Sequence, residues 1–318
     1  MDAIGGYFSL ELPIREEYHK DALRLNTGRN CLEYILRARK YDKVYIPYYT
    51  CDVVLEPFKK LHIPYEFYHI DIQLEINDRI TLKENEAILY TNYFGLKQRY
   101  VEQLAEKYGS RLIVDNTQAF YAKHIQGIDT FYTCRKFFGV PDGAYLYTDK
   151  LLEDDFVQDE SYDRMAHLLK RIDLSAEQGF VDFRKVDDGL DNQPIREMSK
   201  LTQRIMQSID YEAAAKKRRE NFQILQEQLG EKNNLELKLD DDAVPMVYPL
   251  FTSTIGLREK LIDNKVFVAR YWPNIIDWTQ SSDIENLLAY QMQPLPIDQR
   301  YGKKEINKVI NIVKLNCK

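Results

Sequence analysis

The sequence predicts an α/β protein whose larger part is built on a mostly parallel sheet, followed by a smaller C-terminal α/β domain. The first observation is that short apolar strand patterns alternate with helical patterns up to about residue 150. Such alternation is typical of a parallel sheet that helices cover on both faces. The second observation is the length of 318 residues, which is ample for more than one hydrophobic core.

The elements of the first part follow from local patterns. Residues 1–24 are interpreted as an N-terminal arm, and residues 26–30, NTGRN, mark the start of a helix. In that helix apolar side chains recur every three or four residues from Cys31 to Leu36. A strand at 43–47 is stopped by its final proline. The remaining predicted elements are a helix through residues 53–58, a helix at 100–108, and strands at 65–70, 87–91, 111–115, 130–133 and 144–147.

The second part shows weaker patterns. Residues 151–191 are acidic and predict irregular structure, whereas residues 198–229 predict one long helix rich in Lys, Arg, Glu and Gln. Short strands at 235–237 and 246–251, with helices at 257–264 and 304–315, predict a small α/β domain. The expected organisation is therefore an arm over 1–24, a large domain over 25–195, and a long helix with the small domain over 196–318.

Composition limits the classes of function. The chain has 44 basic and 50 acidic residues and a net charge of −6, which argues against a nucleic-acid partner. No apolar run reaches the length of a membrane span, and the charged start does not resemble a signal peptide. The 4 cysteines form no CxxC pair, so we expect free thiols in a reducing cytoplasm. The 5 histidines show no ligand spacing, so we expect no metal site.

Three features lie where strands of such a sheet end, which is the place at which parallel sheets bind ligands. Gly28 and Arg29 follow Thr27 at a helix start, whose free N–H groups and dipole can hold an anion. Asp115 ends a buried strand, where an ionised acid needs a cationic partner such as a pyridinium nitrogen. Lys136 lies in a partly apolar loop, where its amine can act as a nucleophile.

Each feature also has a plainer explanation. The TGRN turn is equally a capped helix start, a lone Asp after a strand is commonly a turn residue, and most lysines are solvated. Together, however, an anion-binding turn, a strand-end acid and a lysine in one α/β domain are what a pyridoxal phosphate site needs. The sequence therefore favours an enzyme that uses this cofactor.

The same segments resemble the DegT/StrS family of pyridoxal-phosphate-dependent sugar aminotransferases, which have the three-layer fold type I of aspartate aminotransferase. TGRNCLEYIL is similar to the family's phosphate segment, VDNTQAFYA to its D-x-A-Q-A motif, and FYTCRKFFGVPDGAYLYT to its Schiff-base segment. The resemblance implies that Asp115 contacts the pyridine nitrogen and that Gln118 contacts the cofactor ring face or its hydroxyl. It further implies that Lys136 forms the Schiff base and that Thr133 helps to bind the phosphate.

One departure from the family concerns Cys51, which stands where family members commonly have the aromatic side chain that stacks on the cofactor ring. Tyr49 is the substitute that we expect. The resemblance implies a cytoplasmic homodimer that aminates a nucleotide-linked keto sugar with an amino donor such as glutamate. Two alternatives remain open: a sugar dehydratase, in which a histidine would replace Lys136, and a fold relative with a binding or regulatory role.

Overall fold

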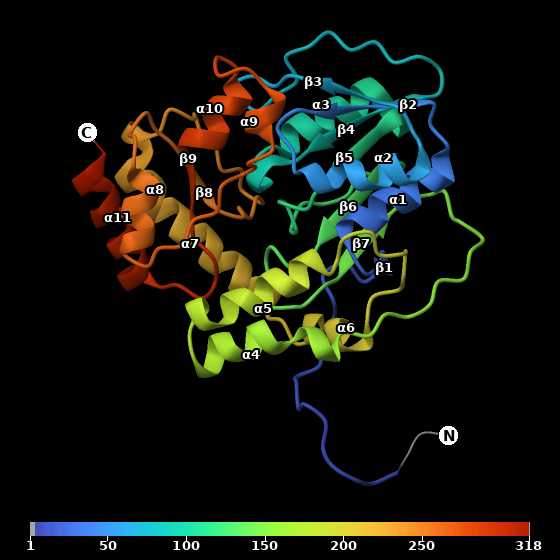
Figure 1. Cartoon of the computed structure of the whole chain (residues 1–318), viewed down its shortest axis with the longest axis horizontal. Coiled ribbons are helices and arrows are strands. Elements are labelled where there is room, and N and C mark those ends of the chain that lie inside the picture. The colour runs from blue at the N-terminus through green and yellow to red at the C-terminus, as the bar shows by residue number, and fades with distance from the viewer. Residues whose placement is uncertain (1–3, 318) are drawn as a thin grey trace.

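A seven-stranded sheet runs through the larger part of the protein, shown in Figure 1 as a computed structural model that describes residues 4–317. Its strands are β1 (Leu23–Leu25), β2 (Lys43–Pro47), β3 (Tyr65–Tyr68), β4 (Glu86–Thr91), β5 (Leu112–Asp115), β6 (Asp129–Thr133) and β7 (Ala144–Tyr147). They lie in the order β1-β7-β6-β5-β4-β2-β3. The five strands from β6 to β3 are parallel, whereas β7 runs antiparallel to β6, and β1 runs antiparallel to β7. The predicted α/β class with a mostly parallel sheet is confirmed.

Helices cover both faces of this sheet, because successive side chains of a strand point to opposite faces. In β4, Ala87 and Leu89 belong to the core beneath α1 (Gly28–Arg39) and α2 (Leu55–Leu61). The intervening Ile88 and Tyr90 belong to the core on the other face, together with side chains of α3 (Gln98–Tyr108). The central strands are buried on both faces, which explains their nearly continuous apolar sequences.

Between β7 and the small domain the chain forms a helical hairpin, which corrects the prediction of irregular structure over residues 151–191. Its helices are α4 (Ala166–Asp173) and α5 (Ala176–Asp188). The hydroxyl of Ser175 caps α5 by accepting the N–H of Gln178 at 3.2 Å. The cap explains why α5 starts here despite the high charge of the segment, which hid the helical pattern in the sequence.

The long helix predicted over residues 198–229 is two helices, α6 (Lys200–Met206) and α7 (Tyr211–Leu229). The carboxylate of Asp210 accepts the N–H of Ala213 at 2.9 Å and thereby caps the start of α7. An Asp in this position stabilises a helix start rather than a helix interior, so the prediction of one continuous helix was wrong.

The small domain contains a two-stranded antiparallel sheet of β8 (Tyr248–Phe251) and β9 (Met292–Leu295). Its helices α8 (Leu257–Asp263) and α11 (Lys303–Asn316) match the predicted ones, and α7 shares their core. The strand predicted at 235–237 is absent from the described chain. The N–H of Asn234 bonds to Phe251 O at 2.8 Å, but residues 235–237 do not continue this contact as a paired strand. β9 was not predicted. Its Pro294, like Pro249 of β8, is tolerated because both strands of a two-stranded sheet are edge strands.

The remaining helices are short. They are α9 (Ile275–Trp278), α10 (Ile284–Gln291) and the 3₁₀ turns at Asp52–Val54, Tyr93–Gly95, Gly109–Arg111, Tyr162–Arg164 and Gly230–Lys232. Within residues 4–317, no helix is long and apolar enough to cross a membrane. In Figure 1 the small sheet lies to one side of the large sheet, with α5 and α7 between the two regions and the N-terminal arm extending away from both.

Candidate functional site

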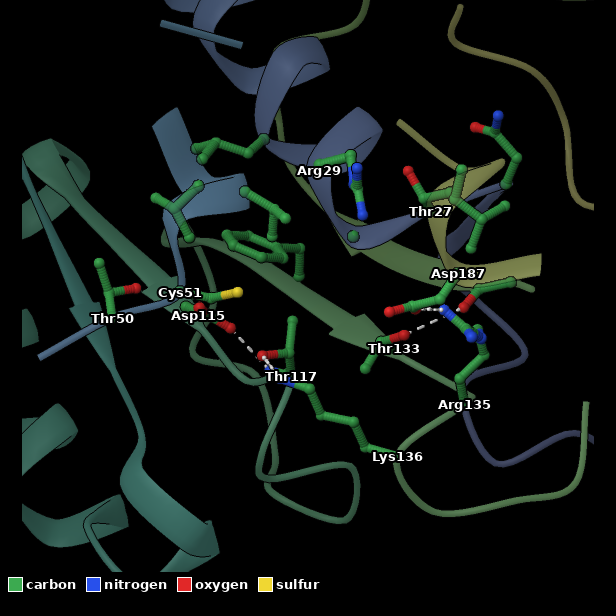
Figure 2. Close-up of a pocket in the computed structure, with 18 of the residues that line it drawn as sticks. Thr27, Arg29, Thr50, Cys51, Asp115, Thr117, Thr133, Arg135, Lys136 and Asp187 are labelled. Atoms are coloured by element: carbon green, nitrogen blue, oxygen red, sulfur yellow. Dashed lines mark hydrogen bonds and ion pairs between the residues drawn. The ribbon is translucent and has the colours of Figure 1, made fainter. Parts of the chain in front are cut away.

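A cavity of about 260 Å³ lies at the carboxyl ends of β5 and β6, beside the start of α1 (Figure 2). We call it the strand-end cavity. Six residues singled out in the sequence line it: Thr27, Gly28, Arg29, Asp115, Thr133 and Lys136. The fold therefore brings together side chains that are more than a hundred positions apart, because parallel strands end at one edge of the sheet.

The start of α1 forms one wall of the strand-end cavity. Thr27 caps the helix, and its hydroxyl oxygen accepts the N–H of Asn30 at 3.1 Å. The first N–H groups of a helix have no acceptor within it, so this wall presents donors to an anion. Gly28 keeps the wall open, because a Cβ there would approach Thr117 Cγ2 at 3.3 Å. The guanidinium of Arg29 forms ion pairs with Glu56 and Asp191. The group that Arg29 presents to a ligand is therefore its backbone N–H.

Asp115 is the last residue of β5 and its side chain is buried, with 4% of the residue exposed. One carboxylate oxygen accepts the N–H of Thr117 at 2.8 Å. Burial raises the pKa of Asp115, and the positive charge of Lys136 only partly opposes that effect. Within residues 4–317 no cation pairs directly with this carboxylate. A buried carboxylate that has no cationic partner is stabilised by a cationic ligand group next to it.

Lys136 reaches the same cavity from the loop between β6 and β7. Its ammonium group donates a hydrogen bond of 3.0 Å to the hydroxyl of Thr117. The loop is held by a turn in which the N–H groups of Phe137 and Phe138 both bond to Cys134 O. Figure 2 shows Thr117 between Asp115 and Lys136, so one threonine contacts the carboxylate through its backbone and the amine through its side chain.

Thr133 ends β6 on the side of the strand-end cavity that faces α1. Its hydroxyl lies 3.5 Å from Gly143 O, and the residue is partly exposed. Because this contact is long, the hydroxyl remains free to donate to an anion held at the start of α1. A phosphate between the two walls would meet donors from both.

Tyr49 and Gln118 lie outside the lining of the strand-end cavity. The Tyr49 side chain is fully buried and packs edge-to-face on Trp272, with ring centroids 5.1 Å apart. The carbonyl oxygen of the Gln118 side chain accepts the N–H of Phe94 at 2.9 Å, and its Nε2 has no partner among the described residues. Contacts of these two side chains with a cofactor remain predictions.

The structure brings three further side chains to the strand-end cavity, those of Thr117, Arg135 and Trp272. Thr117 was part of the motif around Asp115, but its link to Lys136 depends on how two loops meet. Arg135 lines the strand-end cavity and forms an ion pair of 2.8 Å with Asp187 of α5. Trp272 joins the lining from the second half of the chain. No sequence pattern connects Asp187 to the sheet, because only the tertiary fold brings it there.

Comparison with known proteins identifies the fold. No family model and no curated protein sequence matches the chain. Among solved structures, the DegT DnrJ EryC1 StrS aminotransferase from Brucella abortus superposes with a TM-score of 0.63 at 14% identity, covering 95% of this chain and 90% of that one. NtdA from Bacillus subtilis, with bound cofactor PMP, gives 0.64 at 15% identity, covering 93% and 73%. The sugar aminotransferase CalS13 from Micromonospora echinospora gives 0.56 at 14% identity, covering 93% and 88%.

The chain therefore has the fold of these aminotransferases, which is the three-layer fold predicted from the sequence. At this level of identity the likeness establishes the architecture. The activity has to be argued from the side chains of the strand-end cavity.

Proposed function

We propose that the protein is a pyridoxal-phosphate-dependent aminotransferase of the DegT/StrS type that aminates a keto sugar. The observation that carries this proposal is the joint placement of Asp115, Lys136 and the start of α1 around one cavity of about 260 Å³. The three groups suit a cationic ring nitrogen, a carbonyl carbon and a phosphate, respectively.

The residues present fit this cofactor. The buried carboxylate of Asp115 has a raised pKa and no direct ion pair in the described chain, so a pyridinium N–H beside it would supply the missing charge. The N–H groups of Gly28 and Arg29 and the hydroxyl of Thr133 would hold the phosphate. A Cβ at Gly28 would narrow this space. When bound, pyridoxal phosphate supplies an electron-withdrawing ring that stabilises negative charge on the substrate carbon.

The chain's own residues would bind the cofactor, orient the amine and transfer the proton. Lys136 would bind the cofactor through Nζ and, once released, move a proton at Nζ to and from the substrate carbon. Thr117 would orient that amine through its hydrogen bond of 3.0 Å. Asp115 would keep the proton on the ring nitrogen throughout the reaction.

The substrate belongs to the proposal as well. CalS13, which shares the fold, is a sugar aminotransferase, and the family resemblance adds a nucleotide-linked keto sugar and an amino donor such as glutamate. A homodimer in the cytoplasm is part of the same proposal. The long helix α7 and the partly exposed hairpin leave surface available for a second copy.

Borohydride reduction tests the assignment of Lys136. Purified protein is incubated with pyridoxal phosphate, reduced and digested, and the peptides are analysed by mass spectrometry. A phosphopyridoxyl group on Lys136 is expected in the wild type and in Lys123→Ala, since Lys123 is 81% exposed and lies outside the cavity. Lys136→Ala should lose the modification. An unmodified Lys136 in the wild type would overturn the proposal.

Amino-group transfer is tested separately. The loaded protein is mixed with glutamate, and conversion of the cofactor to its amine form is followed by absorbance. A modified Lys136 without conversion by any amino donor would favour the binding or regulatory alternative.

A further inference from the structure

A second cavity, of about 450 Å³, lies between the chain that follows β3 and the start of α10. We call it the acidic cavity. Its lining comes from residues 69–72, 77 and 78 on one side and from residues 283–285 on the other. A contact between His69 and Glu285 joins the two sides, and α10 lies near the end of β3 (Figure 1). Among the described residues, none lines both this cavity and the strand-end cavity.

Four carboxylates line the acidic cavity, and none of the described residues around it is a lysine or an arginine. Three of the four, those of Asp71, Asp78 and Asp283, form no ion pair with any residue from 4 to 317. In the same part of the chain Glu285 pairs only with His69, at 3.2 Å, and a histidine is charged only when it is protonated. At neutral pH the cavity therefore has an excess of negative charge that no ion pair within the described chain neutralises.

Glu285 is the least exposed of these acids, since 0% of the residue is accessible to solvent. Its Oε1 accepts the N–H of Ile70 at 2.7 Å and lies 3.2 Å from Nδ1 of His69. Glu285 and both of these partners line the acidic cavity, so the carboxylate lies in its wall. Its Oε2 has no hydrogen-bond partner among the described residues. A buried carboxylate oxygen without a donor destabilises the protein, and a ligand N–H group that enters the cavity would satisfy it.

The other carboxylates are held at separate points of the wall by backbone groups. One oxygen of Asp78 accepts the N–H of His69 at 2.7 Å. One oxygen of Asp283 accepts the N–H of Gln280 at 2.8 Å. Within residues 4–317 no three carboxylate, histidine or cysteine side chains form a group that could hold a metal ion. The arrangement therefore suits several cationic groups spaced along one molecule better than a single metal ion, which needs converging ligands.

Apolar surface lies among these charges. Ile72 and Ile284 line the acidic cavity and are partly exposed. An aromatic surface continues from its edge: the ring of His69 lies 4.6 Å from that of Tyr48, which stacks on Phe67 at 4.6 Å. Methylene groups pack on apolar side chains, and cations bind to the faces of aromatic rings. The lining thus matches a ligand that combines a hydrocarbon chain with positive charge.

We propose that the acidic cavity binds an aliphatic diamine or polyamine. One ammonium group would donate to Oε2 of Glu285, and a second would pair with Asp78 or Asp283. The methylene groups between them would pack on the two isoleucines, and the bound molecule would connect the end of β3 with α10. The site is independent of the proposed function, because it needs neither Lys136 nor the cofactor.

Calorimetric titration of the full-length protein tests this proposal. The protein is first treated with pyridoxal phosphate and borohydride and dialysed, so that an added amine cannot react with an aldehyde. It is then titrated with spermidine, with putrescine and with butylamine in about 0.15 M salt, which screens unspecific attraction to a protein of net charge −6. Saturable binding of spermidine and putrescine is expected. Butylamine, which has one ammonium group, should bind roughly tenfold more weakly than putrescine or worse.

Asp78→Asn and Asp283→Asn each remove one charge but keep an oxygen for the backbone contact. Each should weaken spermidine binding roughly tenfold, which is the typical effect of losing a charged hydrogen bond. Glu285→Gln keeps the acceptor for the N–H of Ile70 and should lower the affinity by a similar factor. Asp277→Asn is the matched control, since Asp277 is an exposed acid of α9 that does not line the cavity. Its affinity should remain within about twofold of the wild type.

The absence of saturable spermidine binding would overturn the proposal. So would an equal loss of affinity in Asp277→Asn and Asp283→Asn, which would show a general charge effect. Displacement of spermidine by an equimolar amount of Mg²⁺ would show a metal site instead, and equal affinities for butylamine and putrescine would show that the carboxylates do not act at separate points. Circular dichroism checks the fold of each variant, and if one unfolds the remaining two acids carry the test. None of these results depends on modification of Lys136, so this inference and the proposed function can fail separately.

Discussion

Lys136 and Thr117 are joined by a hydrogen bond of 3.0 Å between the lysine ammonium and the threonine hydroxyl. The backbone N–H of Thr117 bonds in turn to Asp115 at 2.8 Å. The distance between the proposed nucleophile and the proposed ring-binding acid is thus controlled by one residue. Because the two contacts use different parts of Thr117, a side-chain substitution can remove one and keep the other.

Thr117→Val should slow the reaction without unfolding the protein. Valine has nearly the same shape and retains the N–H that bonds to Asp115, but it cannot accept a hydrogen bond from Lys136. We expect kcat to fall about tenfold, the typical effect of losing a hydrogen bond to a charged group. Thr117→Ser should restore most of the rate. Wild-type kinetics in Thr117→Val would mean that Lys136 does not need this contact.

Asp115→Asn should stabilise the protein without cofactor. The amide keeps an oxygen for the N–H of Thr117 but removes a buried charge. Because burial raises the pKa of Asp115 above 3.8, the folded state binds its proton more tightly than the unfolded state. Wild-type stability therefore falls as the pH rises through this raised pKa, and the asparagine variant escapes that loss. Urea unfolding at pH 4 and pH 7 should show a larger advantage of the variant at pH 7.

The same substitution should weaken cofactor binding, because the amide cannot neutralise a pyridinium. We expect the affinity for pyridoxal phosphate to fall at least tenfold, measured by fluorescence or absorbance titration. Asp187→Asn is a control, since Asp187 lines the same cavity but pairs with Arg135. Equal losses in both variants would indicate a general charge effect instead of a contact with the ring nitrogen.

The sequence predicted the sheet better than it predicted the helices of the second half. Strands such as β2 and β5 are short apolar runs that end at a proline or an acid, and these patterns do not depend on distant contacts. The α4–α5 hairpin was missed because many of its apolar side chains, including Ile172 and Phe180, remain exposed. The apolar residues of α4 and α5 do recur at helical spacing, but the acidic residues around them led to a prediction of irregular structure.

The sequence also predicted the residues of the candidate site only in part. Asp115 and Lys136 were recognisable because strand ends and a local motif marked them. Stacking of Tyr49 on the cofactor remains a prediction, and its ring is buried against Trp272 outside the cavity lining. The sequence could not show that the rings of Tyr49 and Trp272 would pack against each other, because that contact depends on the tertiary fold. Asp187 escaped notice for the same reason, because its contact with Arg135 depends on where the hairpin docks.

Gly143→Ala should destabilise the protein and distort the strand-end cavity. Gly143 has a φ of 101°, which disfavours any residue with a Cβ. An added Cβ would lie 2.7 Å from Thr202 Cγ2 and 3.2 Å from Cys134 Sγ. We expect a loss of roughly 2–4 kcal/mol in the free energy of unfolding, from backbone strain and overpacking together. Gly127→Ala is a control, since its φ is also positive but nothing lies within 4 Å of the added Cβ.

Cys51 should report on occupancy of the strand-end cavity through the pH dependence of its alkylation. It lines the cavity and is partly exposed, whereas Cys31, Cys134 and Cys317 are buried. Burial raises the pKa of the Cys51 thiol to about 11, so little reactive thiolate exists near neutral pH. Alkylation by iodoacetamide should be slow at pH 7.5 and about tenfold faster for each pH unit up to pH 10. Cys51→Ser should abolish this phase.

Loading with pyridoxal phosphate should slow the alkylation of Cys51 further, since the cofactor and the reagent would compete for the same space. The measurement compares loaded and unloaded protein at pH 9.5, where the thiolate fraction is large enough to give a measurable rate. The same comparison in Lys136→Ala separates simple occupancy from covalent attachment: protection should be weaker there, because the cofactor would be held by the phosphate and Asp115 contacts alone. Identical rates in loaded and unloaded wild-type protein would mean that the cofactor does not occupy the cavity beside Cys51.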